Sequence, residues 1–264
     1  MAWLPNVDMI SQARQQRAGE TVSAPAANTF YIGFDATRSP FDAVRVRQAF
    51  VHAVDRKTWA EVVWRNVVTP ATGGFTPPGL PGYAEGIGLA YDPERARSLL
   101  AEAGYPQGRG FPVIEAWAPL RTDDREYLYL QAQWREHLGV EVTWQMFKWN
   151  AYLEQLATHK PHLFTLPWAA DYPDPDCFLR PALHHQQHWH NEQYEQLLDS
   201  ARRVNDPVER LKFYQAADRL LMQEAGIMPL GYGQWYLLIK PWVKRYPISP
   251  LGTSYLKDVI IEPH

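Results

Sequence analysis

The chain has 264 residues, of which 46% are hydrophobic and 21% charged, and its formal net charge is −3 at pH 7. This balance indicates a globular protein with a core of its own, and the small net charge gives no electrostatic reason to expect nucleic acid or an anionic membrane as a partner. The single cysteine, Cys177, excludes an internal disulfide and cysteine-rich metal motifs.

The sequence shows neither a transmembrane helix nor a signal peptide. No stretch approaches the roughly 18 apolar residues of a transmembrane helix. Residues 1–16 lack a basic region followed by an apolar core, so we expect no signal peptide within the chain. The 11 Trp and 14 Tyr residues fit either ordinary aromatic packing or a cleft lined with rings.

The first third of the chain predicts one short strand and two helices. Phe30–Phe34 has the composition of a strand, and Asp42 is a suitable N-cap for a helix whose apolar stripe includes Val46 and Phe50. Residues 73–88 are rich in glycine and proline and predict a loop. Asp92 and Pro93 then open a second helix, which Gly104 ends.

The middle of the chain alternates between strand and helix patterns. The expected elements are a strand at 113–118, a helix that Thr122 caps and that runs to Leu138, a strand at 140–146, a helix at 150–158 and a strand at 162–167. This order predicts a parallel sheet with right-handed crossovers and helices on both faces. Antiparallel hairpins over the same residues would contradict this prediction.

Two helices and a strand complete the pattern. Asn191 is the expected cap of the first helix, and Asp206-Pro207 followed by Glu209 opens the second as a capping box. Residues 227–239 predict a strand interrupted by two glycines, and residues 240–264, with four prolines, predict an irregular tail.

The stretch WAADYPDP, residues 168–175, lies just beyond the third expected parallel strand, where ligands of open α/β sheets bind. Asp174 precedes a proline and an apolar run, so we expect it to cap a short helix, with Asp176 in the first turn. Asp171 has no such duty. It is either a turn former or a carboxylate that accepts hydrogen bonds from a cationic ligand group.

Other candidate sites have simpler explanations. His184, His185, His188 and His190 form a cluster in which two histidines four residues apart could hold Zn²⁺ or Ni²⁺, but no acid or cysteine completes the set. We expect a solvated loop there. Arg121, Arg125 and Lys148 could contact a ligand carboxylate, although solvation at the surface is the simpler expectation. No GxSxG, HExxH or P-loop motif is present, so we expect no catalysis.

A chelator tests the histidine cluster. If it holds no structural metal, the melting temperature of the protein should be the same with and without the chelator. A drop of more than a few degrees on chelation would mean that a bound metal supports the fold.

Three segments carry a resemblance to a known family. Residues 40–56 (PFDAVRVRQAFVHAVDR), 91–105 (YDPERARSLLAEAGY) and 168–175 resemble, in order and spacing, signatures of the extracytoplasmic solute-binding proteins of the peptide and nickel type, family 5. Residues 75–82 and 210–214 match weaker motifs. The resemblance covers roughly residues 28–246, and it is to the C-terminal half of a longer protein.

The resemblance implies a fold. We expect an α/β lobe of the type II periplasmic-binding-protein kind, with a mostly parallel sheet flanked by helices. Residues 36–230 would form this ligand-binding lobe. Residues 1–35 would supply strands and a hinge segment of an incomplete first lobe, and residues 231–264 would return to that lobe.

It also implies a function. The chain would be the substrate-binding component of an ABC importer, located in the periplasm or outside the cytoplasm, which captures a peptide or related solute as a monomer without a cofactor. Asp171 would hold the ligand's α-ammonium group beside Trp168 and Tyr172, with Trp235 and Tyr236 as further aromatic walls. Two alternatives stay open: the ligand-sensing domain of a cytosolic transcription regulator, and nickel or a nickel chelate as the ligand.

Overall fold

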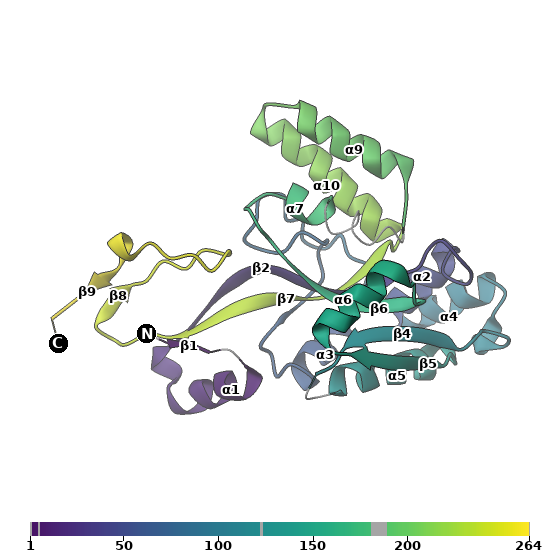
Figure 1. Ribbon diagram of the computed structural model, residues 1–264, viewed down its shortest axis with the longest axis horizontal. Coiled ribbons are helices and arrows are strands. Elements are labelled where there is room, and N and C mark those ends of the chain that lie inside the picture. The colour runs from purple at the N-terminus through teal and green to yellow at the C-terminus, as the bar shows by residue number, and fades with distance from the viewer. Residues whose placement is uncertain (1, 5, 122–123, 181–188, 264) are drawn as a thin grey trace.

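The computed structural model describes residues 2–4, 6–121, 124–180 and 189–263. Within these residues the main sheet has seven strands in the order β1-β7-β2-β6-β4-β5, with β3 paired to β7 (Figure 1). The strands are β1 (Ala2–Trp3), β2 (Thr21–Phe34), β3 (Thr69–Pro70), β4 (Ile114–Pro119), β5 (Val142–Phe147), β6 (Leu163–Ala169) and β7 (Ile227–Leu238).

The predicted parallel unit is confirmed. β4 pairs in parallel with both β5 and β6. The crossover helices α5 (Arg125–Leu138) and α6 (Trp149–Thr158) cover opposite faces, because Trp134 of α5 packs in the core cluster with Ala116, whereas Tyr152 of α6 packs in the one with Trp117. Successive residues of a strand point to opposite faces, so these two neighbours mark the two sides of the sheet.

The rest of the sheet is antiparallel, so the sheet as a whole is mixed. β2 is antiparallel to β6 on one side and to β7 on the other. The sequence predicted a strand only over Phe30–Phe34, but β2 begins at Thr21. The extra residues, TVSAPAANT, lack the alternation of a half-buried strand. They are extended because Thr21 to Pro25 pair with Leu238 to Gln234 of β7.

The helices that precede β4 in the chain are α1 (Val7–Gln16), α2 (Val44–His52), α3 (Arg56–Val62) and α4 (Pro93–Glu102). The prediction that Asp42 caps α2 is wrong. Its side chain accepts the N–H of Ala43, and Ala43 occupies the N-cap position without a side-chain bond. Asp92 caps α4 as predicted, by accepting the N–H of Arg95.

Two arginines of the first signature segment are buried and bind backbone. Arg47 and Arg56 are 3% and 6% exposed, and burial lowers the pKa of each to about 10. Arg47 donates to the carbonyls of Phe41, Asp42, Glu224 and Ala225, and Arg56 to those of Ala71, Leu89 and Pro229. Both therefore join α2 and α3 to distant segments and serve the fold.

The glycine- and proline-rich loop, as predicted, contains no helix or strand between residues 71 and 92. The buried Asp218 holds it by accepting the N–H groups of Phe75 at 2.7 Å and Thr76 at 3.1 Å. Burial raises the pKa of this carboxyl to about 6, although the two backbone bonds oppose the rise. Gly74 is required here, because a Cβ would lie 2.2 Å from an oxygen of Asp218.

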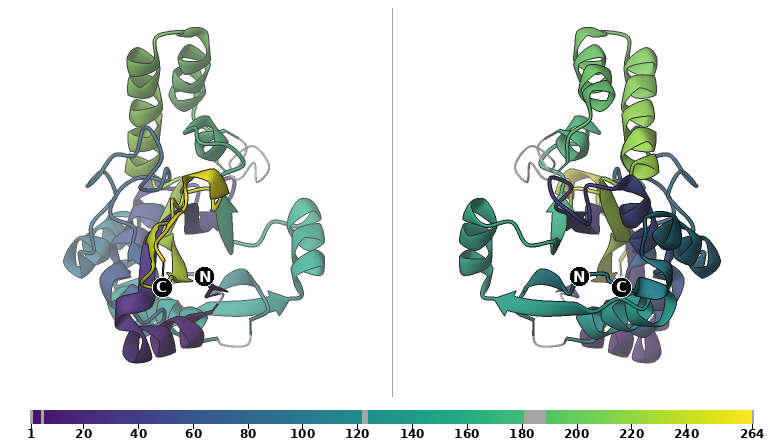
Figure 2. Two further views of the ribbon diagram at one scale, coloured as in Figure 1. Left: turned by 90° about the vertical axis from the view of Figure 1, so that its left-hand side faces the viewer. Right: turned by 90° about the vertical axis from the view of Figure 1, so that its right-hand side faces the viewer.

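Helices α9 (Glu192–Arg203) and α10 (Pro207–Gln223) form a hairpin that projects from the body of the molecule beside the short α7 (Asp176–Leu179) (Figures 1 and 2). The predicted caps are confirmed: Asn191 accepts the N–H of Tyr194, and Asp206 accepts that of Glu209. The inner side of the hairpin, including Leu198 and Leu221, packs in the same core cluster as α6.

Loss of the α10 cap should be measurable. Asp206→Ala leaves the Glu209 N–H without its acceptor and is expected to cost about 1 kcal/mol of unfolding free energy. Asp206→Asn keeps an acceptor and should be close to neutral. Urea denaturation of the three proteins checks this, and equal stability of wild type and Asp206→Ala would contradict it.

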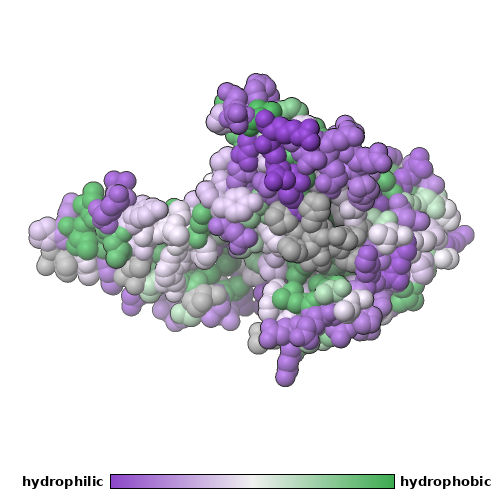
Figure 3. Space-filling view, turned by 45° about the horizontal axis from the view of Figure 1, so that its top comes forward, coloured by the Kyte–Doolittle hydropathy of each residue, from purple (hydrophilic) through white to green (hydrophobic). Residues whose placement is uncertain are grey.

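The C-terminal tail is more ordered than predicted. It contains a two-stranded sheet of β8 (Val243–Arg245) and β9 (Ile260–Ile261), and it extends away from the main body (Figure 1). Apolar side chains of the tail are exposed, at Leu256, Ile260 and Ile261 (Figure 3). No described helix of the chain is both long and apolar enough to span a membrane.

Candidate functional site

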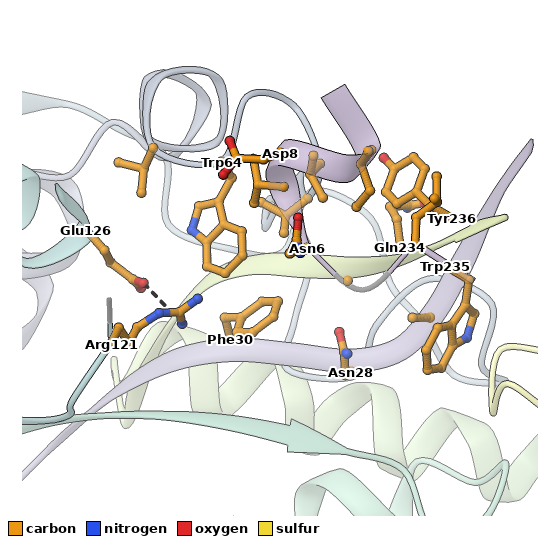
Figure 4. Close-up of a pocket in the computed structure, with 18 of the residues that line it drawn as sticks. Asn6, Asp8, Asn28, Phe30, Trp64, Arg121, Glu126, Gln234, Trp235 and Tyr236 are labelled. Carbon is orange, nitrogen blue, oxygen red and sulfur yellow. Dashed lines mark ion pairs between the residues drawn. The ribbon is translucent and has the colours of Figure 1, made fainter. Parts of the chain in front are cut away.

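A cavity of about 550 Å³ lies beside β2 and β7 and is bordered by β1, α1, the segment that links α3 to β3, the segment that links β4 to α5 and the start of α5 (Figure 4). Because β2 and β7 pair over most of their length, they form a continuous floor. Asn28 and Phe30 lie two apart on β2, so both point from the same face of that strand into the cavity.

Aromatic rings form much of the cavity wall. Phe30 and Trp64 lie with ring centroids 5.2 Å apart, and Trp3 meets Trp235 edge to face at 5.1 Å. The Trp235 Nε1–H donates to the carbonyl of Pro250 at 2.9 Å, which fixes this ring. Such walls suit a ligand with apolar parts, since rings provide large contact areas with few rotatable bonds.

One ionic pair lines the same cavity. The guanidinium of Arg121 lies 4.8 Å above the Trp64 ring and 3.8 Å from the carboxylate of Glu126 (Figure 4). Glu126 is only 7% exposed, and burial raises the pKa of this carboxyl to about 7 in spite of the nearby positive charge. Arg121 is exposed to solvent as expected, with 41% of its side chain accessible, and it also lines the cavity.

Two polar atoms that line this cavity are buried without a hydrogen-bond partner in the described part of the chain. They are the Asn28 side-chain oxygen and the Trp64 Nε1–H. Gly233 allows the approach of Asn28, because a Cβ at that position would lie 1.8 Å from the Asn28 oxygen. Buried polar groups normally have partners, so these two atoms are unusual features of the residues that form this wall.

A second cavity of about 230 Å³ lies at the carboxyl ends of β4 and β6 and shares Phe30, Arg121 and Glu126 with the first. Pro119 ends β4, and Thr165 to Pro167 belong to β6. The second cavity therefore lies at the edge of the parallel strands where a ligand was expected, and the first cavity adjoins it through the three shared residues.

The WAADYPDP stretch lies next to this edge but does not line either cavity. Trp168 packs against the core cluster that contains Cys177, and its Nε1–H donates to the Cys177 carbonyl at 2.8 Å. Asp171 is exposed, and its backbone N–H contacts the Cys177 sulfur at 3.2 Å. The exposed Tyr172 places its hydroxyl 3.5 Å from Asp176.

Backbone pairing connects this stretch to the first cavity. Ala169 lies opposite Asn28 in the β2–β6 ladder, and the next N–H, that of Ala170, donates to the Ala27 carbonyl at 2.8 Å. Asp171 follows directly after this bond. It therefore begins the exposed segment two residues beyond the end of β6, whose partner strand β2 lines the first cavity.

The capping duty predicted for Asp174 is only partly correct. α7 begins at Asp176 with Pro175 in the N-cap position, and Asp174 accepts the N–H of Asp176 at 2.9 Å. Asp174 also accepts two bonds from Arg210 of α10, at 2.6 and 2.9 Å, which the sequence pattern did not predict. These bonds raise the pKa of the guanidinium.

The predicted site residues thus fall into two groups. Trp235 and Tyr236 line the first cavity, and the Tyr236 hydroxyl accepts a bond from Arg14 at 2.7 Å. Trp168, Asp171 and Tyr172 lie in the neighbouring segment. His184, His185 and His188 lie outside the described residues, and among the residues that are described no three His, Cys, Asp or Glu side chains gather as a metal site.

Comparison with known proteins gives a consistent result. The sequence profile of the "Bacterial extracellular solute-binding proteins, family 5 Middle" matches residues 1–189. The chain is 31% identical over 271 residues to "Heme-binding protein A" of Haemophilus influenzae, covering 98% of this chain and 49% of that protein. It is 29% identical over 278 residues to the "Probable deoxycholate-binding periplasmic protein YgiS" of Escherichia coli, covering 100% of this chain and 51% of that protein.

Solved structures agree. The structure "MppA Periplasmic Murein Tripeptide Binding Protein, Unliganded Open Form" superimposes with a TM-score of 0.87 at 27% identity, over 99% of this chain and 53% of that one. The chain spans about half the length of the relatives it matches. The profile match covers well over half of the chain, which therefore belongs to the bacterial extracellular solute-binding proteins of family 5.

Proposed function

We propose that the chain is the C-terminal, ligand-binding half of an extracytoplasmic solute-binding protein that delivers a peptide or a related small solute to an ABC importer. The observation that carries this proposal is the cavity on β2 and β7, which combines tryptophan walls, an ionic pair and two buried polar atoms without partners in the described residues. Such a site suits reversible capture of a solute, and we assign no chemical step to it.

The charges of two side chains suggest which groups of a ligand they would contact. Asp171 is an exposed carboxylate at the end of β6, suited to an ammonium group, and Arg121 is a half-exposed cation in the cavity, suited to a carboxylate. A ligand that carries both charges, such as a short peptide, would satisfy both residues. Trp235 and Tyr236 would contact its apolar parts, with Trp168 and Tyr172 beside Asp171.

The partners and location belong to the same proposal. A protein of this family would act as a monomer outside the cytoplasm and dock on the permease subunits of its importer. The relatives are named for different solutes, namely heme, deoxycholate and a murein tripeptide. We favour a peptide because the acidic and basic residues above match its two termini. No observation favours the regulator or the nickel ligand.

Titration calorimetry tests the proposal. Trialanine should bind the chain, and blocking either its amino or its carboxyl terminus should weaken binding. Sodium deoxycholate and haem are the comparison ligands. Binding of either of these with no detectable binding of trialanine would contradict the peptide assignment.

A further inference from the structure

The segment that carries Asp171, residues 170–176, contains no helix or strand before α7 begins at Asp176. Its first residue is fixed by the bond from Ala170 to β2, and its far end by the start of α7. Between these points Asp171, Tyr172 and Pro173 are exposed. The position of Asp171 therefore depends on contacts made by the second half of the segment.

Those contacts converge on α10. Arg210 binds both carboxylate oxygens of Asp174, at 2.6 and 2.9 Å, in the two-pronged geometry that matches a guanidinium to a carboxylate. The same guanidinium donates to the Tyr214 hydroxyl at 3.1 Å and lies 4.8 Å above that ring. Tyr214 in turn donates to Asp176 at 3.0 Å, so two acids of the segment are bound through one arginine.

The loop at residues 73–88 contacts the segment as well. Gly82 has a φ of +82°, and a Cβ at that position would lie 2.8 Å from the Pro175 ring. Arg180 pairs with Asp176 at 3.2 Å. Asp174 and Arg210 are about one quarter exposed, with side-chain exposures of 24% and 30%, so water weakens their attraction less than it would at an open surface.

We propose that Arg210 is a positioning residue for ligand capture, because its bonds to Asp174 pin the 170–176 segment onto α10 and thereby hold Asp171 at the end of β6. This inference rests on the proposed role of Asp171 as a ligand contact. It assigns to Arg210 no contact with the ligand. α10 would thus hold in place the segment that carries Asp171.

Cys177 provides a reporter for this segment. It is the single cysteine of the chain, it is fully buried, and its sulfur contacts the Asp171 N–H. A thiol reagent such as dithionitrobenzoate can reach the sulfur only when the segment lifts or the protein unfolds. The labelling rate without denaturant therefore measures local opening, and its dependence on urea separates opening from global unfolding.

Arg210→Met should increase the labelling rate about tenfold or more, as expected for loss of a charged, bidentate pair. The urea midpoint should change little. Arg210→Lys keeps the charge without the two-pronged geometry and should give an intermediate rate. Arg219→Met, at an exposed arginine of the same helix, is the matched control and should label like wild type.

Asp174→Asn is the second variant. It retains an oxygen for the Asp176 N–H and removes the charge that Arg210 binds, so it should label as fast as Arg210→Met. The double variant should be no faster than either single one. Unchanged labelling in both single variants would overturn the proposal, and so would faster labelling accompanied by an equal loss of global stability.

Trialanine titrations connect the segment to the ligand. Arg210→Met should weaken trialanine binding in the wild-type background and have no further effect in the Asp171→Ala background. Additive losses would overturn the positioning role. Equal trialanine affinity of wild type and Asp171→Ala would instead mean that the proposed function fails, and the labelling rates would still decide whether Arg210 pins the segment.

Discussion

Asp171→Ala is expected to weaken trialanine binding by about 1.5–3 kcal/mol, which is roughly a tenfold to hundredfold loss of affinity. The reason is that an ammonium group brought to this end of β6 would lose its charged acceptor. The fold should be unaffected, because Asp174 makes the contacts to α7 and α10, and the backbone of Asp171, rather than its carboxylate, makes the closer contact with Cys177. Calorimetry gives the affinity and thermal melting gives the stability.

The matched ligand is N-acetyl-trialanine, which has no ammonium group. It should bind wild type more weakly than trialanine does, and the Asp171→Ala substitution should weaken it little further. If the substitution reduced binding of both ligands equally, Asp171 would be a turn former and the ammonium contact would be wrong.

Glu126→Gln is expected to stabilise the protein at pH 8 by up to about 3 kcal/mol. Burial raises the pKa of Glu126 from 4.5 to about 7, so the folded state binds this proton more tightly than the unfolded state does. The stability gained from protonation is therefore fully present below about pH 4.5 and is lost as the pH rises through about 7. Glutamine imitates the protonated acid at every pH.

Urea unfolding of wild type and Glu126→Gln between pH 4 and pH 8 checks this. The difference in unfolding free energy should be small near pH 4 and largest above pH 7. Glu136→Gln, at an exposed acid of the same helix α5, should show no such trend. A difference that stays constant over the pH range would contradict the buried, high-pKa carboxyl.

Local sequence patterns predicted the parallel core well. The stretch at 140–146 alternates and becomes β5, while the helix before it ends at Gly139, which adopts a left-handed φ of 69°. Local sequence patterns failed where pairing with a strand distant in the sequence determines the structure. The first half of β2 has no strand pattern and is extended through its pairing with β7, far along the chain.

The residues of the candidate site also include some that the sequence predicted and some that it did not. Asp171 was a candidate from the sequence alone, because the nearby Asp174 was expected to cap the helix and Asp171 had no such structural role. The cavity does not stand out, because its residues come from five separate segments of the sequence and converge only in the folded chain. Asn28, Trp64 and Glu126 were missed for this reason. Glu126 in particular has the sequence position of an ordinary first-turn helix acid, and only packing buries it.

The central claim is that the cavity on β2 and β7 is where the solute binds, and the indole N–H signals of the tryptophans in an NMR spectrum test it most directly. On addition of trialanine, the signals of Trp64, whose Nε1–H has no partner in the described residues, and of Trp235 should shift. The signal of Trp134, buried in the core and bonded to the Phe50 carbonyl, should stay in place. Shifts at other tryptophans, with those of Trp64 and Trp235 unchanged, would contradict the account.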